Sequence, residues 1–144
     1  MPRTPLDALL RLRRQELDEA KKLLAEALAR AMTASDAVKS AEQDMVRERD
    51  IAMDLAADDR VVETYSRWLP KGRMALERAR KQEQEASIDV ESCRVRVNLA
   101  RTALEAAENL SEKRATEAQE LAEKREQAML DDLSARRATQ KPDD

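Results

Sequence analysis

The chain has 144 residues, of which 40% are charged and 42% hydrophobic, whereas aromatic residues make up only 1% and phenylalanine is absent. Its 27 Lys and Arg and 30 Asp and Glu leave a net charge of -3, which argues against nucleic acid as the main partner because phosphate binding needs a net basic face. The chain has no His, so it lacks an imidazole base and an imidazole metal ligand. Its one Cys can form neither an internal disulfide nor a multi-thiolate metal site. We therefore expect neither catalysis nor a cofactor.

The remaining composition is dominated by Ala, Glu, Lys, Leu and Arg, which is typical of long helices and coiled coils. No apolar run approaches the roughly 20 residues of a transmembrane helix. The leucine-rich start is interrupted by Asp7, Arg11, Arg13 and Arg14, so it does not resemble a signal peptide. We therefore expect a soluble cytoplasmic protein with no transmembrane segment.

The first predicted helix covers residues of about 5–60. Thr4 is a good cap, Pro5 suits the first helical position, and Asp7 stands where a capping-box carboxylate belongs. Two lines with a seven-residue period follow, as in a coiled coil. One line is Leu10, Leu17, Leu24, Ala31, Val38, Met45 and Ala52, and the other is Arg13, Ala20, Ala27, Ala34, Ala41, Glu48 and Leu55.

Residues of about 61–72 are predicted to form the tip at which the chain reverses direction. They contain the only Gly, Trp and Tyr and the one Pro that lies away from the ends of the chain. Pro70 disfavours helix in the residue before it, and Gly72 permits a left-handed turn.

The second predicted helix covers residues of about 73–138, and a frayed tail is expected at 139–144. The heptad lines resume here and loosen near residue 110. One line is Leu76, Glu83, Val90, Val97, Leu104, Ser111 and Ala118, and the other is Ala79, Ala86, Cys93, Ala100, Ala107, Arg114, Leu121 and Ala128.

These elements predict an all-α fold, a long antiparallel two-helix coiled-coil hairpin that forms a single domain over residues 1–144. The preferred register places Leu10 opposite Leu121 and Met45 opposite Ala86, so that large side chains face small ones in most layers. An alternative register, one heptad further along, opposes Leu24 with Arg114. We expect the free chain to be mainly monomeric.

The C-terminal residues 126–138, EQAMLDDLSARRA, resemble the closing motif of the FliJ family of flagellar type III export proteins. The leucine-rich residues 6–17, LDALLRLRRQEL, resemble the start of that family. The resemblance spans nearly the whole chain. The YscO-type stalk proteins of injectisomes are close cousins, and the sequence does not separate the two systems.

The resemblance implies a non-enzymatic stalk of the export apparatus. Such a stalk would insert into the hexameric export ATPase and stimulate it, connect it to the export gate protein, and escort export chaperones. It would be cytoplasmic and peripherally associated with the apparatus at the inner membrane. The alternative is a generic coiled-coil scaffold or adaptor, which would dimerise through the same heptads.

Six residues are candidates for partner binding. Arg11 and Arg14 would meet Arg136 and Arg137 at the terminal end of the hairpin, which we expect to enter the ATPase ring; a solvated charged face is the plainer interpretation. Tyr65 and Trp68 are either partner anchors or a cover over the apolar end of the hairpin. Cys93 lies on a heptad line, which favours a small buried hydrophobic residue over a redox switch.

Overall fold

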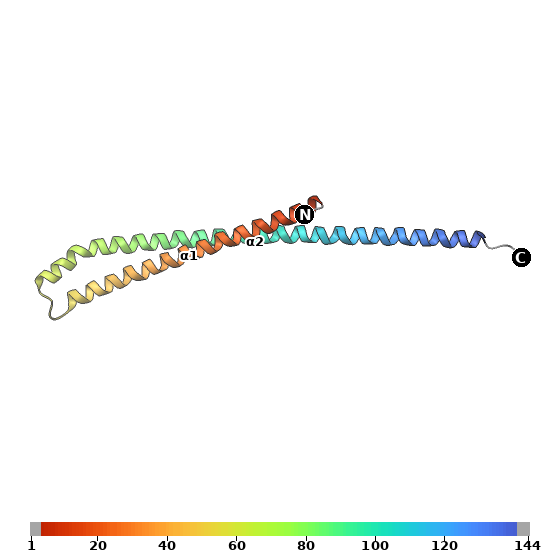
Figure 1. Cartoon of the computed structure of the whole chain (residues 1–144). Coiled ribbons are helices and arrows are strands. Elements are labelled where there is room, and N and C mark those ends of the chain that lie inside the picture. Colours follow the sequence, from red (N-terminus) through yellow and green to blue (C-terminus); the bar gives the residue numbers. More distant parts are fainter. Residues whose placement is uncertain (1–3, 141–144) are drawn as a thin grey trace. The chain divides into compact units, whose positions relative to one another are not determined.

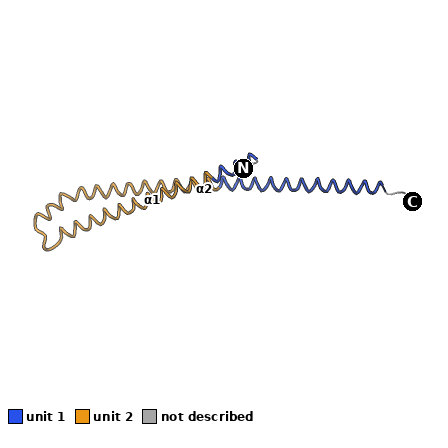
Figure 2. The backbone as a smooth tube through the Cα atoms, viewed as in Figure 1, with its two compact units in different colours: residues 1–14, 102–144 blue, residues 15–101 orange. Residues whose placement is uncertain are grey.

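The computed structural model describes residues 4–140. Within this range the chain forms two helices and no strand: α1, Pro5–Met53, and α2, Asp59–Gln140 (Figure 1). The predicted all-α, two-helix hairpin is confirmed. Contacts divide the chain into two compact units, residues 15–101 and residues 1–14 with 102–144 (Figure 2).

The unit of residues 15–101 is an antiparallel helical hairpin in which α1 and α2 lie side by side (Figure 1). Its buried apolar side chains all belong to the predicted heptad lines; they are Leu17, Ala20, Ala27, Val38, Ala79, Val90 and Val97. The seven-residue period therefore identifies the packed face of both helices correctly. Most of these side chains are Ala or Val, so each layer removes little apolar surface from water.

In the other unit, packing involves only the first part of the α2 segment. Leu6, Leu10 and Arg13 of α1 are partly buried, and Ala107 of α2 is 5% exposed. Ser111 is the last partly buried residue, because every side chain from residue 112 to residue 140 is exposed. The predicted loosening of the seam near residue 110 is thereby confirmed.

The predicted start of α1 is also confirmed. The backbone N–H of Asp7 donates a hydrogen bond of 3.1 Å to Thr4 Oγ1, and the N–H of Ala8 donates one of 3.3 Å to the Thr4 carbonyl. Thr4 thus satisfies one of the N–H groups that a helix start leaves without a partner.

The turn lies at residues 54–58, so the predicted tip at residues 61–72 is wrong. Two aspartates shape the turn through their side chains. Asp54 Oδ1 accepts a hydrogen bond of 3.2 Å from the N–H of Ala56, and Asp58 Oδ1 accepts one of 3.1 Å from the N–H of Val61. The first is an Asx turn and the second is the cap of α2. Consequently α1 ends at Met53 instead of near residue 60.

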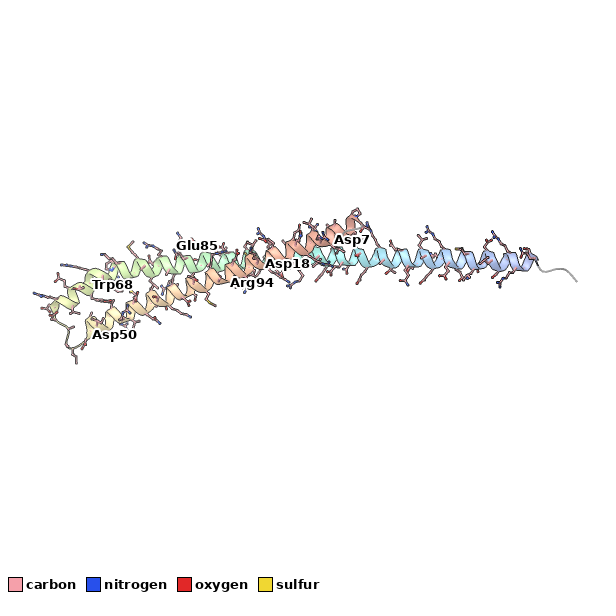
Figure 3. All side chains as sticks on the ribbon, viewed as in Figure 1. Asp7, Asp18, Asp50, Trp68, Glu85 and Arg94 are labelled. Carbon is pink, nitrogen blue, oxygen red and sulfur yellow. The ribbon has the colours of Figure 1, made fainter. Side chains whose placement is uncertain are left out.

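Pro70 and Gly72 lie inside α2, which begins at Asp59 and not near residue 73. Gly72 does not have a positive φ angle, so it makes no left-handed turn. Pro70 is exposed and removes one helical hydrogen bond, and the ribbon of α2 bends in its first turns near Trp68 (Figure 3). A bend without a break is the usual effect of one proline when helix continues on both sides.

α2 continues to Gln140, two residues beyond its predicted end. The frayed tail predicted for 139–144 is therefore wrong for Thr139 and Gln140, and its remainder lies outside the described residues.

The predicted helix register is wrong as well. Met45 does not face Ala86, because its Sδ lies 2.9 Å from the position that a Cβ on Gly72 would occupy. An ion pair of 3.6 Å between Glu42 and Arg80 agrees with this placement. Gly72 precedes Ala86 by two heptads, so the same faces meet at a different offset. The turn sets this offset, and it lies closer to the N-terminus than the predicted tip.

Candidate partner-binding surfaces

The C-terminal segment of α2, residues 112–140, has no helix packed against it within its unit. Several large apolar side chains are consequently at least half exposed: Leu121, Met129, Leu130 and Leu133 are 50%, 67%, 51% and 53% exposed. Exposed apolar side chains add little to the stability of an isolated helix in water, and most helical stability in proteins comes from packing. This segment is therefore the strongest candidate for a partner-binding surface.

Part of this apolar surface forms a stripe along one face. The stripe is made of residues that follow one another at intervals of three, four or seven: Ala115, Ala118, Ala122, Met129 and Leu133. Intervals of this kind place side chains on the same side of an α-helix. Arg136 follows Leu133 by three residues and extends the same face. The stripe has the pattern of a helix face that another helix covers.

The predicted basic cluster does not form. Arg11, Arg14, Arg136 and Arg137 are all exposed, but the α1 segment packs on α2 no further than Ser111. Arg136 lies about 38 Å beyond Ser111 along α2 at 1.5 Å per residue. It pairs with Asp132 on its own helix, at 3.2 Å. The preferred register, with Leu10 opposite Leu121, already placed Arg11 opposite Glu120 and left Arg136 beyond it, and the observed offset separates the two pairs of arginines further.

Tyr65 and Trp68 lie in the first turns of α2 and not in the turn itself. Their rings are stacked, with centroids 6.4 Å apart and planes inclined by 29°. Both side chains are partly buried, and the indole of Trp68 lies over Gly72. These contacts favour packing inside the hairpin. A role of either ring in binding a partner stays a prediction.

Sequence reasoning did not include the large apolar residues of 112–140 among the site residues. The signal was present, since the heptad lines lose their apolar character at Arg114 while the apolar positions move to Ala115, Ala122 and Met129. A change of stripe within one continuous helix indicates a change of partner. The assumed register concealed this, because it placed Leu121 inside the hairpin opposite Leu10.

Metal-ligating side chains do not gather anywhere in the part of the chain that the structure describes. Residues 4–140 contain no group of three or more His, Cys, Asp or Glu arranged to hold a metal ion. Cys93 is partly buried on its predicted heptad line. Neither helix, over the part that the structure describes, has a stretch that is long and apolar enough to span a membrane.

Comparison with known proteins agrees with the family resemblance of the terminal motifs. The family model described as Flagellar FliJ protein matches residues 2–143, nearly the whole chain. The chain belongs to the FliJ family. It is therefore a flagellar protein connected with protein export, from a family that is not catalytic. No curated protein and no solved structure matches it.

Proposed function

We propose that this FliJ-family protein is the stalk of the flagellar export apparatus. Residues 112–140 of α2 insert into the hexameric export ATPase and stimulate its ATP hydrolysis. The hairpin of residues 15–101 connects the ATPase to the export gate protein and to export chaperones. The protein works in the cytoplasm, at the export apparatus on the inner membrane. These roles rest on the resemblance to the family. The exposed, unpacked helix of residues 112–140 supports its selection as the segment that inserts into the ATPase.

The observation that carries this proposal is the length of exposed helix beyond Ser111. A single helix is narrower than a two-helix hairpin, so it can enter a narrower central opening. The apolar stripe supplies contacts for the inner wall of the ring. Since Met129 is 67% exposed and Leu133 is 53% exposed, both side chains are available to such a partner. Flexible methionine suits a contact that must be remade as the ring subunits change conformation.

The charged side chains of residues 112–140 are suited to reversible electrostatic contacts with the ATPase. Residues 112–140 carry seven carboxylates and six basic side chains, so the segment is nearly neutral but densely charged. Exposed charges of this kind mostly affect association rate and salt sensitivity. Arg136 and Arg137 lie near the end of the helix, where they can reach acidic groups of a partner. Higher salt should therefore weaken the association with the ATPase.

The proposal is tested by titrating the purified export ATPase of the same organism with this protein and measuring ATP hydrolysis. The double variant Met129→Ser, Leu133→Ser should require about tenfold more protein for half-maximal stimulation, because a few well-packed side chains carry most of the binding energy of an interface and a loss of about 1.4 kcal/mol weakens binding tenfold. The double variant Arg136→Glu, Arg137→Glu should shift the titration in the same direction.

A matched control is available on the hairpin. Met74 and Leu99 are 61% and 67% exposed, so Met74→Ser, Leu99→Ser removes the same two side-chain types elsewhere on α2. This variant should stimulate the ATPase as the wild type does. Equal stimulation by all variants, or no stimulation by the wild type, would refute the stalk proposal.

The mass of the chain in solution separates the stalk from a coiled-coil scaffold. A stalk should sediment as a monomer of 16.3 kDa. A scaffold should dimerise through the stripe, and Met129→Ser, Leu133→Ser should then return it to the monomer. The second result would favour the scaffold and also explain the exposed stripe.

A further inference from the structure

The turn-end surface, residues 48–63, exposes large apolar side chains where a turn is normally polar. Leu55 is 104% exposed, Met53 is 76%, Ile51 is 51% and Val62 is 46% exposed. All four come from a stretch of only twelve residues at the end of the hairpin. An apolar patch of this kind commonly marks a site of contact with another protein.

The same surface is strongly acidic. Residues 48–63 contain six carboxylates and two arginines, a net charge of -4 in a chain whose total is -3. Asp54 and Asp58 also bond to backbone N–H groups of the turn, and Glu63 pairs with Arg67 at 2.8 Å. These local bonds explain the presence of some carboxylates but leave the surface negatively charged. Its occupant should therefore be basic.

The grooves of the turn-end surface indicate that its occupant is a helix. A groove of about 720 Å³ runs along α1, where it is lined by Gln43, Val46, Arg47 and Asp50, and it reaches the turn at Ile51 and Asp54. Four residues at i, i+3, i+4 and i+7 form the hole that receives a side chain from a neighbouring helix in coiled-coil packing. Ile51 also borders a groove of about 200 Å³ between the two helices, next to Val61 and Tyr65.

We propose that the turn-end surface binds a basic amphipathic helix of a partner protein. Apolar side chains of that helix contact Ile51, Met53 and Leu55, while its Lys and Arg face the surrounding carboxylates. An anionic lipid surface would be repelled by the net charge of residues 48–63, and so would the same surface of a second copy. The acidic charge thus selects one kind of occupant for the apolar patch.

This inference goes beyond the stalk proposal and does not depend on it. The turn-end surface belongs to the unit of residues 15–101, whereas the ATPase contact is proposed for residues 112–140. A variant of the turn should therefore stimulate the ATPase normally. Failure of the two proposals can be told apart, because one is measured by peptide binding and the other by ATP hydrolysis.

The test uses a fluorescein-labelled peptide with leucine at the a and d positions of about three heptads and lysine elsewhere. Fluorescence anisotropy should show that it binds the full chain. Met53→Ser, Leu55→Ser should weaken this binding about tenfold, as the loss of apolar anchors does at other interfaces. Asp50→Lys, Asp59→Lys should also weaken it, and a peptide with glutamate in place of lysine should not bind.

Two control variants keep the test specific. Met74→Ser, Leu99→Ser removes exposed apolar side chains, and Glu85→Lys, Asp89→Lys reverses exposed charges, both away from the turn. Each should bind the peptide as the wild type does. The proposal is wrong if the turn variants and the controls bind equally, if the glutamate peptide also binds, or if neither peptide binds. It is also wrong if the chain self-associates and Met53→Ser, Leu55→Ser abolishes that association, since the occupant is then a second copy.

Discussion

Gly72, the single glycine of the chain, lies buried in α2 beneath the indole of Trp68. A Cβ at this position would lie 2.6 Å and 2.8 Å from two atoms of the indole and 2.9 Å from Met45 Sδ. The residue is therefore needed for the space that it leaves and not for an unusual backbone angle. Glycine costs a helix roughly 1 kcal/mol relative to alanine, so close packing must offset that cost here.

We predict that Gly72→Ala does not stabilise the protein despite the better helix propensity of alanine. Displacing the indole and the Met45 side chain should cost about 1–3 kcal/mol, which equals or exceeds the propensity gain. Trp68 is the only tryptophan, so its fluorescence reports the displacement directly. The emission should shift to longer wavelength and thermal unfolding should begin earlier.

The control for this prediction is Ser87→Ala, at an exposed position of the same helix. It should leave the emission spectrum unchanged and keep or slightly raise the melting temperature. A higher melting temperature for Gly72→Ala with unchanged emission would show that the indole does not occupy this space.

The position of the turn was predicted wrongly from the sequence, whereas the packed faces of the two helices were predicted correctly. Heptad lines are a repeated signal, and the positions from Leu10 to Ser111 that were assigned to the seam are nearly all buried or partly buried. The position of a turn depends on a few residues, and Pro70 with Gly72 is the stronger breaker by residue type alone. Asp54 and Asp58 shape the turn through side-chain hydrogen bonds to the backbone. Aspartate is common throughout this charge-rich chain, so the sequence alone does not distinguish these two from the others.

At the scale of this element, we predict that Asp58→Ala destabilises the protein by about 1 kcal/mol, the usual cost of losing a helix cap. The N–H of Val61 would lose its acceptor at the start of α2. Thermal unfolding followed by circular dichroism should show a lower melting temperature. Asp58→Asn retains an acceptor oxygen and should behave nearly as the wild type. A melting temperature unchanged by Asp58→Ala would mean that α2 does not begin here.

The register of the hairpin is a property of the whole fold that periodicity cannot determine. Heptads repeat, so sliding one helix past the other by two heptads brings equivalent positions together and satisfies the same pattern. Only the turn distinguishes such registers. The register error also hid part of the candidate site: the loosening near residue 110 was predicted, but Leu121 was assigned to the hairpin seam, whereas the structure leaves every residue of 112–140 exposed. The terminal motifs could be found from sequence because they are local.

A crosslinking experiment checks the register. In a Cys93→Ser background, Glu42→Cys with Arg80→Cys should be joined within one chain by a short bifunctional thiol reagent, because these residues form an ion pair. Glu42→Cys with Asp89→Cys, the pair that the sequence-derived register would favour, should not be joined. Asp89 lies about 14 Å further along α2 at 1.5 Å per residue. Crosslinking of the second pair alone would restore the register derived from sequence.

Residues 112–140 are proposed to be the element that docks into the export ATPase. Hydrogen exchange of the chain, alone and with the hexameric ATPase, tests this proposal most directly. In the free chain, backbone amides of residues 112–140 should exchange faster than those of the packed α2 residues 76–101. A helix with no neighbour packed against it opens more readily than a packed helix. Adding the ATPase should slow exchange in residues 112–140 and leave residues 76–101 unchanged. Slower exchange confined to the turn-end surface, with residues 112–140 unaffected, would contradict the account.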